Sequence, residues 1–164
     1  MSQTRRAGFV ALIGAPNAGK STLTNRLVGS KVSIVTQKVQ TTRFPVRGVA
    51  IEGRAQIVLG DTPGIFKPRR RLDRAMVRSA WGGAGDADAV VHLVDVQSEL
   101  AVAEGRAKGA DHRQIEDARA ITEGLKGAGT KAILALNKID GIKRDSLLAV
   151  TQSYFDPGAY SEVF

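Results

Sequence analysis

The sequence predicts a three-layer α/β domain whose sheet is mostly parallel, with one antiparallel edge strand. Short apolar runs alternate with helix-like segments, the order typical of a parallel sheet covered by helices on both faces. Two of the runs are joined only by 52–54, which is far too short for a parallel crossover, so these two strands must form a hairpin. Polar motifs directly follow three runs, at the carboxyl ends where open α/β sheets bind ligands.

The predicted strands are short runs rich in Val, Ile, Leu and Ala, taken in order as 9–13, 46–51, 55–59, 89–94, 131–136 and 161–164. The predicted helices carry apolar residues at helical spacing over 19–28, 67–80, 115–125 and 147–154. The stretch 30–43 is Val-rich but interrupted, and 98–112 is polar without periodicity; both are expected to be flexible loops. The last run looks like the opening of a strand, and we expect 1–164 to be a single domain.

Composition restricts the class of protein further. At 164 residues the chain is long enough for one domain with a sizeable core, and its 43% hydrophobic and 24% charged residues are typical of a soluble protein. No apolar run approaches the roughly 18 residues that span a membrane, and 1–6 lacks the apolar core of a signal peptide. The absence of cysteine excludes disulfides and thiolate metal sites. We therefore expect a cytoplasmic protein.

The net charge of +8 and the pI near 10.2 indicate a polyanionic partner. Much of the excess is clustered within the helix-like stretch 67–80, whose apolar face would be Leu72, Met76 and Ala80. Two interpretations of this basic stretch stay open, a solvated helix face and a contact with RNA or the ribosome. The clustered basic residues are Lys67, Arg69, Arg70, Arg71, Arg74 and Arg78.

The first polar motif follows the strand 9–13 and precedes a helix. It fits the phosphate-binding pattern G-x-x-x-x-G-K-[ST], in which small residues let several backbone N–H groups and a helix N-terminus point at one anion. We expect Lys20 to reach the β- and γ-phosphates of a nucleoside triphosphate and the Ser21 hydroxyl to bind Mg²⁺. The apolar strand before the motif and the helix after it disfavour the alternative, which is an ordinary glycine-rich turn. The predicted binding residues are Gly14, Ala15, Pro16, Asn17, Ala18, Gly19, Lys20, Ser21 and Thr22.

The second motif, Asp61-Thr62-Pro63-Gly64, ends the second strand of the hairpin and fits D-x-x-G. An aspartate at a strand end can orient Mg²⁺ or one of its waters, and the N–H of Gly64 can contact the γ-phosphate. Taken alone, the same residues are also a plausible turn. Their position about forty residues after the phosphate motif, at a strand end, favours a functional site.

The third motif, Asn137-Lys138-Ile139-Asp140, follows the strand 131–136 and selects the base. The Asp140 carboxylate can accept two hydrogen bonds from the N1–H and exocyclic amine of guanine, which adenine cannot donate. Adenine is rejected because it would leave Asp140 unpaired. We expect Asn137 to contact the base edge and the phosphate loop, and the Lys138 stem to lie over the base. The alternative is a polar strand-to-helix loop.

A fourth segment, Gln40-Thr41-Thr42-Arg43, lies in the expected loop 30–43. We assign Thr42 as the second Mg²⁺-binding hydroxyl and as the contact of the γ-phosphate. Thr41 is a direct rival, because spacing in a single sequence cannot separate neighbouring residues. Both threonines are also compatible with an ordinary loop.

Together the four motifs resemble those of the translation-factor-related GTPases, and their residues are most similar to the Era family of bacterial ribosome-assembly GTPases. The resemblance covers nearly the whole chain. It implies a P-loop GTPase domain that binds GTP or GDP with Mg²⁺, and a role in small-subunit assembly and 16S rRNA maturation. Members contact 16S rRNA and the 30S subunit mainly through a KH domain, which nothing here matches. The fifth motif, a Ser-Ala segment, is also absent, so the resemblance implies a GTPase domain truncated before it.

Two features depart from the family. Gly60 replaces the apolar residue expected before the aspartate, and 98–112 is longer than the usual loop. The resemblance also leaves a peripheral association with the inner face of the plasma membrane among the expectations, together with a monomeric state. Competing classes are a P-loop kinase or ATPase, which would not need 137–140, a module that mainly docks on RNA, and other guanine switches in tRNA modification or iron transport.

Hydrolysis requires an unusual arrangement, because Ile65 stands where many GTPases have the glutamine that orients the attacking water. In relatives with this replacement, the asparagine matching Asn17 helps to hold K⁺, which adds positive charge near the reacting phosphate. Asn17 is also a residue type favoured in tight turns, which is the alternative. We place Lys20, Asn17, Thr42 and Gly64 around the reacting phosphate and expect slow hydrolysis that is faster with K⁺ than with Na⁺.

Overall fold

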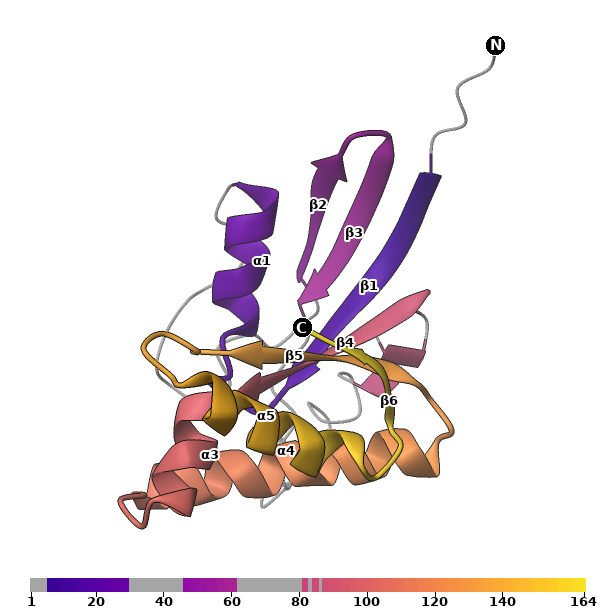
Figure 1. Cartoon of the computed structure of the whole chain (residues 1–164). Coiled ribbons are helices and arrows are strands. Elements are labelled where there is room, and N and C mark those ends of the chain that lie inside the picture. The colour runs from indigo at the N-terminus through magenta and orange to yellow at the C-terminus, as the bar shows by residue number, and fades with distance from the viewer. Residues whose placement is uncertain (1–5, 30–45, 62–80, 83, 86) are drawn as a thin grey trace.

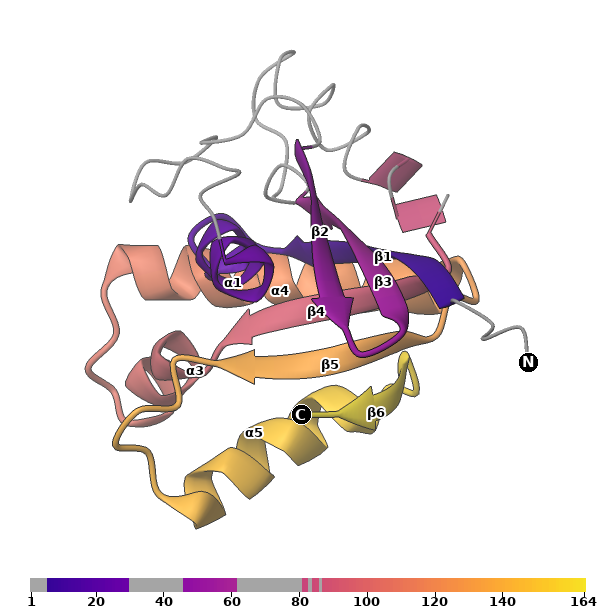
Figure 2. The ribbon, with the colours of Figure 1, turned by 90° about the horizontal axis from the view of Figure 1, so that it is seen from above.

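The computed structural model describes 6–29, 46–61, 81–82, 84–85 and 87–164. Within these residues the chain forms a six-stranded sheet in the order β2-β3-β1-β4-β5-β6 (Figures 1 and 2). All neighbouring strands are parallel except β2 and β3, which form the predicted antiparallel hairpin at one edge. The strands are β1 (Arg6–Gly14), β2 (Val46–Glu52), β3 (Ala55–Asp61), β4 (Ala89–Asp95), β5 (Ala132–Asn137) and β6 (Tyr160–Val163).

Helices cover both faces of the sheet, so the predicted three-layer α/β fold is confirmed. Helix α1 lies on one face, and α3, α4 and α5 lie together on the other (Figure 1). The latter face holds the main apolar core, in which Ile13, Val90 and Leu134 from three strands meet Ile121 of α4 and Tyr154 of α5. The helices are α1 (Lys20–Val28), α3 (Val96–Ala103), α4 (Gly109–Gly127) and α5 (Arg144–Phe155).

The strand register brings the polar motifs to one edge of the sheet. Gly14 at the end of β1 lies opposite Leu93, and Asp61 at the end of β3 lies opposite Leu12. Asp95 at the end of β4 lies opposite Asn137 at the end of β5. Because these strands are parallel, their carboxyl ends point the same way, and residues far apart in sequence converge there.

The prediction that 98–112 forms a flexible loop was wrong, because that stretch contains most of α3 and the start of α4. Two aspartates start these helices. The Asp95 carboxylate accepts a hydrogen bond from the Ser98 N–H at 3.2 Å as the N-cap of α3. Asp111 accepts from the Lys108 N–H at 2.8 Å and from the Ser98 hydroxyl at 3.0 Å. The hydrogen bond from the Lys108 N–H, and to a smaller extent that from the Ser98 hydroxyl, lower the pKa of Asp111. Capping hydrogen bonds therefore mark the starts of helices in a stretch where apolar periodicity is weak.

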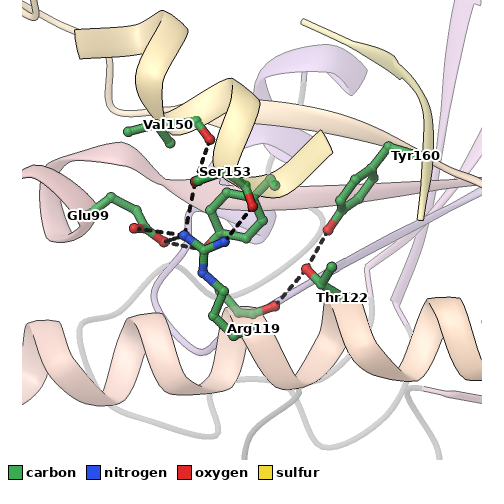
Figure 3. A network of polar contacts seen from close by, with 8 residues as sticks. Glu99, Arg119, Thr122, Val150, Ser153 and Tyr160 are labelled. Carbon is green, nitrogen blue, oxygen red and sulfur yellow. Dashed lines mark hydrogen bonds and ion pairs between the residues drawn. The ribbon is translucent and has the colours of Figure 1, made fainter. Parts of the chain in front are cut away.

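A polar network joins α3, α4 and α5 (Figure 3). Arg119 of α4 donates to both Glu99 carboxylate oxygens, at 3.3 and 3.4 Å, and to the Ser153 carbonyl at 2.9 Å. Its guanidinium also lies 3.8 Å from the centre of the Tyr154 ring, whose hydroxyl donates to Glu99. One side chain of α4 thus holds both neighbouring helices.

The departure at Gly60 has a packing reason. The Phe9 ring of β1 lies over Gly60 of β3, and a Cβ at this position would come within 2.6 and 2.8 Å of two ring atoms. An apolar side chain before Asp61 would therefore displace Phe9. The aromatic ring of one strand fills the space that a side chain of the other would occupy.

Two predicted features lie wholly outside the described residues, namely the helix 67–80 with its basic cluster and the loop 30–43. Among the helices that the structure describes, none combines the length and apolar character needed to cross a membrane.

Candidate nucleotide-binding site

The loop between β1 and α1 is packed so closely on the neighbouring strands that two of its positions require glycine. A Cβ at Gly14 would lie 2.8 Å from the Leu93 carbonyl oxygen of β4. Gly19 has φ 106°, a backbone conformation that L-residues rarely adopt, and a Cβ there would overlap the Asn137 amide of β5. The two glycines of the phosphate motif therefore let the loop approach both strands.

The start of α1 fits an anion. Gly19 is its N-cap and supplies no side-chain hydrogen bond, and the first turn carries no acidic residue. N–H groups at a helix start that lack a side-chain cap, together with the helix dipole, favour a phosphate. A loop that a Cβ would fill and a helix start without a cap are what a phosphate group requires.

Lys20 lies inside this loop. Only 6% of the residue is exposed, and its Nζ donates to the carbonyl oxygens of Gly14 at 3.3 Å and Ala15 at 3.0 Å. These two main-chain acceptors hold the ammonium inside the loop between β1 and α1. The placement agrees with the predicted role of Lys20 toward the β- and γ-phosphates, which stays a prediction.

Asn137 and Lys138 join the base-reading segment to the phosphate loop. Asn137 Nδ2 donates to the Ala18 carbonyl at 2.8 Å, which is the predicted contact with the loop. Lys138 Nζ donates to the Asn17 carbonyl at 3.0 Å. Asp140 follows, exposed in a turn. Two side chains from the end of β5 thus make the phosphate loop and the base-reading segment one unit.

Asn17 has a left-handed backbone with φ 64°, which fits its interpretation as a turn residue. The side chain is half-buried, whereas the flanking Pro16 and Ala18 are buried. The predicted role of Asn17 toward K⁺ stays a prediction.

The predicted Mg²⁺ ligands are only partly described. Ser21 is half-buried in the first turn of α1, and Thr22 beside it is exposed. For Asp61 the structure gives the backbone, at the end of β3. Thr41, Thr42, Gly64 and Ile65 lie outside the described residues, so their roles stay predictions.

Sequence reasoning missed Asp95. This residue is only 7% exposed, and its Oδ2 lies 2.6 Å from Lys138 Nζ. The available signal was its position, because Asp95 directly follows the apolar run 89–94 just as the recognised motifs follow theirs. An acidic residue at this strand end adds an ion pair to the segment that is predicted to read the base.

A glycine-restricted phosphate loop joined to an Asn-Lys-x-Asp segment at the carboxyl edge of a parallel sheet defines a P-loop domain of the guanine-nucleotide-binding class. The comparison with protein families agrees, since the family described as 50S ribosome-binding GTPase matches residues 9–138. The chain belongs to this family.

The expected resemblance to the Era family is confirmed by curated relatives. The chain is 71% identical over 159 residues to GTPase Era of Caulobacter vibrioides, a match that covers 97% of this chain and 50% of the relative. It is 58% identical over 165 residues to GTPase Era of Maricaulis maris, covering 100% of this chain and 52% of the relative. The chain thus spans about half the length of the curated relatives it matches.

Solved structures give the same result. A crystal structure of Era in complex with MgGDPNP and nucleotides 1506–1542 of 16S ribosomal RNA matches with a TM-score of 0.76 and 33% identity, over 98% of this chain and 50% of that chain. A single-residue variant of Aquifex aeolicus Era bound to GDP.AlF4⁻ matches with a TM-score of 0.77 and 32% identity, over 96% of this chain and 50% of that chain.

Proposed function

We propose that this chain binds GTP and GDP and hydrolyses GTP in a Mg²⁺-dependent reaction, as a molecular switch in assembly of the small ribosomal subunit. One observation supports this most directly. Asn137 and Lys138 both donate to carbonyls of the phosphate loop, at 2.8 and 3.0 Å. Since Asp140 is two residues further on, these bonds would keep the group proposed to read the base close to the loop proposed to bind phosphate.

Nucleotide binding would use the phosphate loop, the segment 137–140 and the predicted Mg²⁺ ligands. The N–H groups at the start of α1 and the ammonium of Lys20 would contact the phosphates. Asp140 would accept two hydrogen bonds from guanine, while the Lys138 stem lies on the face of the base. Ser21, Thr42 and Asp61 would hold Mg²⁺, and the bound ion would offset negative charge on the β- and γ-phosphates.

Hydrolysis would rely on position and charge, because phosphoryl transfer asks for little covalent chemistry from the protein. Ile65 can neither accept a proton nor hold a water, so no side chain at that position orients the nucleophile. The Gly64 N–H and the Thr42 hydroxyl would contact the γ-phosphate, and Asn17 would help to bind K⁺. We therefore expect slow hydrolysis that is faster in potassium than in sodium salt, measured as phosphate release at equal ionic strength. Equal rates would contradict the role of Asn17.

The RNA partner is proposed from relatives. This chain matches about half the length of Era. A crystal structure of Era contains nucleotides of 16S ribosomal RNA. We propose that a protein carrying this domain acts on 16S rRNA and the 30S subunit in the cytoplasm, mainly through a KH domain. Peripheral membrane association and a monomeric state stay predictions.

Base recognition provides the sharpest test of the proposal. In Asp140→Asn, the amide would oppose the N1–H and amine of guanine with a donor, but would suit xanthine, which carries an oxygen at the amine position. We expect GTP binding to weaken about 100-fold or more, with a gain for xanthosine triphosphate, in titrations of fluorescent nucleotide analogues.

Asp145→Asn is the matched control, because Asp145 is also exposed and lies in the first turn of α5 rather than in the base-reading segment. It should leave both affinities unchanged. GTP affinity that is the same in Asp140→Asn as in the unaltered chain would refute the guanine assignment.

A further inference from the structure

We propose that Asp95 is a positioning residue for nucleotide binding: its carboxylate holds the Lys138 ammonium against the phosphate loop and so fixes the lysine stem over the guanine base. This inference rests on the proposed function and adds a residue that the sequence motifs do not include. Asp95 itself would not touch the nucleotide. It would act through Lys138.

The geometry connects three segments through one ammonium group. Asp95 ends β4, directly opposite Asn137 in the strand register, so its side chain meets the residue that follows Asn137. Lys138 Nζ lies 2.6 Å from Asp95 Oδ2 and 3.0 Å from the Asn17 carbonyl oxygen. Charge-assisted hydrogen bonds of this length are among the stronger polar contacts in proteins. The lysine is therefore held at its tip by both β4 and the phosphate loop.

Backbone conformation gives an independent reason for such a contact. Within the described parts of the chain, Asn17 and Lys138 are the two non-glycine residues with positive φ, at 64° and 59°. They are also the two residues joined by the bond from Lys138 Nζ to the Asn17 carbonyl. Left-handed backbone is unfavourable for lysine and persists where surrounding contacts hold it. The Asp95 carboxylate supplies a contact of this kind.

The same carboxylate has a second role that must be separated from the first. Its Oδ1 accepts a hydrogen bond from the Ser98 N–H and caps α3. Asparagine is about as good an N-cap as aspartate, but it carries no charge. Asp95→Asn therefore keeps the cap of α3 while removing the ion pair with Lys138.

Positioning through Lys138 predicts a specific pattern of affinities. The lysine stem lies on the face of the base, so its loss affects all purine nucleotides, whereas Asp140 reads the edge. In titrations of the 164-residue chain with fluorescent GDP and IDP, we expect Asp95→Asn to weaken both by about tenfold, with an unchanged GDP-to-IDP ratio. IDP lacks the exocyclic amine, so a changed ratio would show that Asp95 acts through Asp140 instead and would overturn the proposal.

Two controls test whether the effect passes through Lys138. Asp111→Asn makes the same chemical change at another helix start, where the carboxylate contacts Lys108 and Ser98, and it should leave GDP affinity unchanged. Lys138→Met keeps an apolar stem without the ammonium and should weaken GDP binding to a similar degree. Asp95→Asn added to Lys138→Met should then have no further effect, because the two residues act as a pair. Additive losses would contradict the proposed pathway.

A measurement without nucleotide separates this inference from the proposed function. Acetic anhydride labelling followed by mass spectrometry reports how accessible each lysine amine is, and the Lys138 amine should be labelled several-fold faster in Asp95→Asn than in the unaltered chain. Equal labelling would overturn the role of Asp95 even if the chain binds GDP. Failure of the unaltered chain to bind any guanine nucleotide would instead overturn the proposed function, and the positioning role with it.

Discussion

Two groups of polar contacts involve strand β4, and they are built in opposite ways. At its carboxyl end, Lys20, Asn137 and Lys138 donate to main-chain carbonyls of the phosphate loop. Where β4 and β6 meet α4, the Tyr160 hydroxyl bonds to the side chains of both His92 and Thr122. The first group fixes the loop between β1 and α1, whereas the second fills the interior. Changes in the first should alter binding, and changes in the second should alter stability.

The interior group has one arrangement that uses every donor. Thr122 donates to the Ala118 carbonyl at 3.2 Å, so its oxygen accepts from the Tyr160 hydroxyl at 2.7 Å. The Tyr160 oxygen then accepts from His92 Nδ1–H at 2.5 Å. His92 is therefore neutral, with its proton on Nδ1, and its ring stacks on Tyr160 at 5.8 Å between centroids. A neutral imidazole suits a site that is closed to water.

The largest expected effect is at the binding edge. Gly19→Ala places a methyl group where the Asn137 amide lies, at a left-handed φ of 106°. Because both the loop and Asn137 must move, we expect affinity for a fluorescent GDP analogue to fall more than about 100-fold. The measurement is an equilibrium titration.

Gly127→Ala is the matched control for this change. A Cβ at Gly127, near the end of α4, meets nothing within 4 Å, so alanine should leave GDP affinity unchanged and stabilise the helix slightly. If Gly19→Ala bound GDP as well as Gly127→Ala, the close packing of the loop would be irrelevant to function.

The interior should respond in the opposite way. Tyr160→Phe removes a hydroxyl that serves both His92 and Thr122, leaving buried polar groups without that partner. We expect the free energy of unfolding to fall by about 2 kcal/mol, or Tm by roughly 5 °C, in urea and thermal melts. GDP affinity should change less than about twofold, since no nucleotide contact is touched.

Thr122→Val tests whether the hydroxyls act as a chain. Its effect combined with Tyr160→Phe should be smaller than the sum of the two, because each change already breaks the bond between them. Strictly additive losses would contradict the shared network, and a large loss of GDP affinity would contradict the separation between the two groups.

An effect of similar size, which appears only at acidic pH, is a pH dependence from His92. Burial first, and then the positive charges of Lys20 and Arg119, lower the pKa of His92 from 6.5 to about 3. The unfolded chain therefore binds this proton below pH 6.5 while the folded chain does not. The stability contribution is complete above pH 6.5 and is lost progressively as pH falls toward 3, which amounts to about 2 kcal/mol by pH 5.

Urea unfolding at pH 7.5 and pH 5 measures this loss. His92→Asn should remove most of the difference between the two pH values, although it also lowers stability at both. His112→Gln, at an exposed position on α4, should keep the difference of the unaltered chain. An unchanged pH dependence in His92→Asn would show that other groups cause it.

Much of this fold follows from local sequence, because apolar runs and short connections have few alternatives. The connection 52–54 required a hairpin, and the structure has β2 and β3 antiparallel at an edge. The prediction of a loop over 98–112 was wrong for the opposite reason, because its helices do not follow from a regular apolar pattern. These helices start beside Asp95 and Asp111, whose hydrogen bonds from backbone N–H groups leave no periodic signal. Helix capping is a contact between nearby residues, but it leaves only a weak pattern in the sequence.

Some residues of the candidate site could likewise be predicted from the sequence, and others could not. The glycines, Lys20 and the segment 137–140 could be predicted from spacing, since phosphate and guanine require particular residue types in a fixed order. Asp95 was not found, because an aspartate after a strand carries no motif of its own. Its importance comes from the parallel pairing of β4 with β5, which places it beside Lys138.

The sequence by itself determined the three-layer α/β class and predicted the phosphate loop and the base-reading segment, because each pattern depends on residues adjacent in the chain. Only the tertiary structure decided that Asn137 and Lys138 hold that loop, that Phe9 excludes a side chain at Gly60, and that His92 is a neutral core residue. These features arise where strands distant in sequence lie side by side. Their hydrogen bonds, packing and desolvation do not exist before the sheet forms.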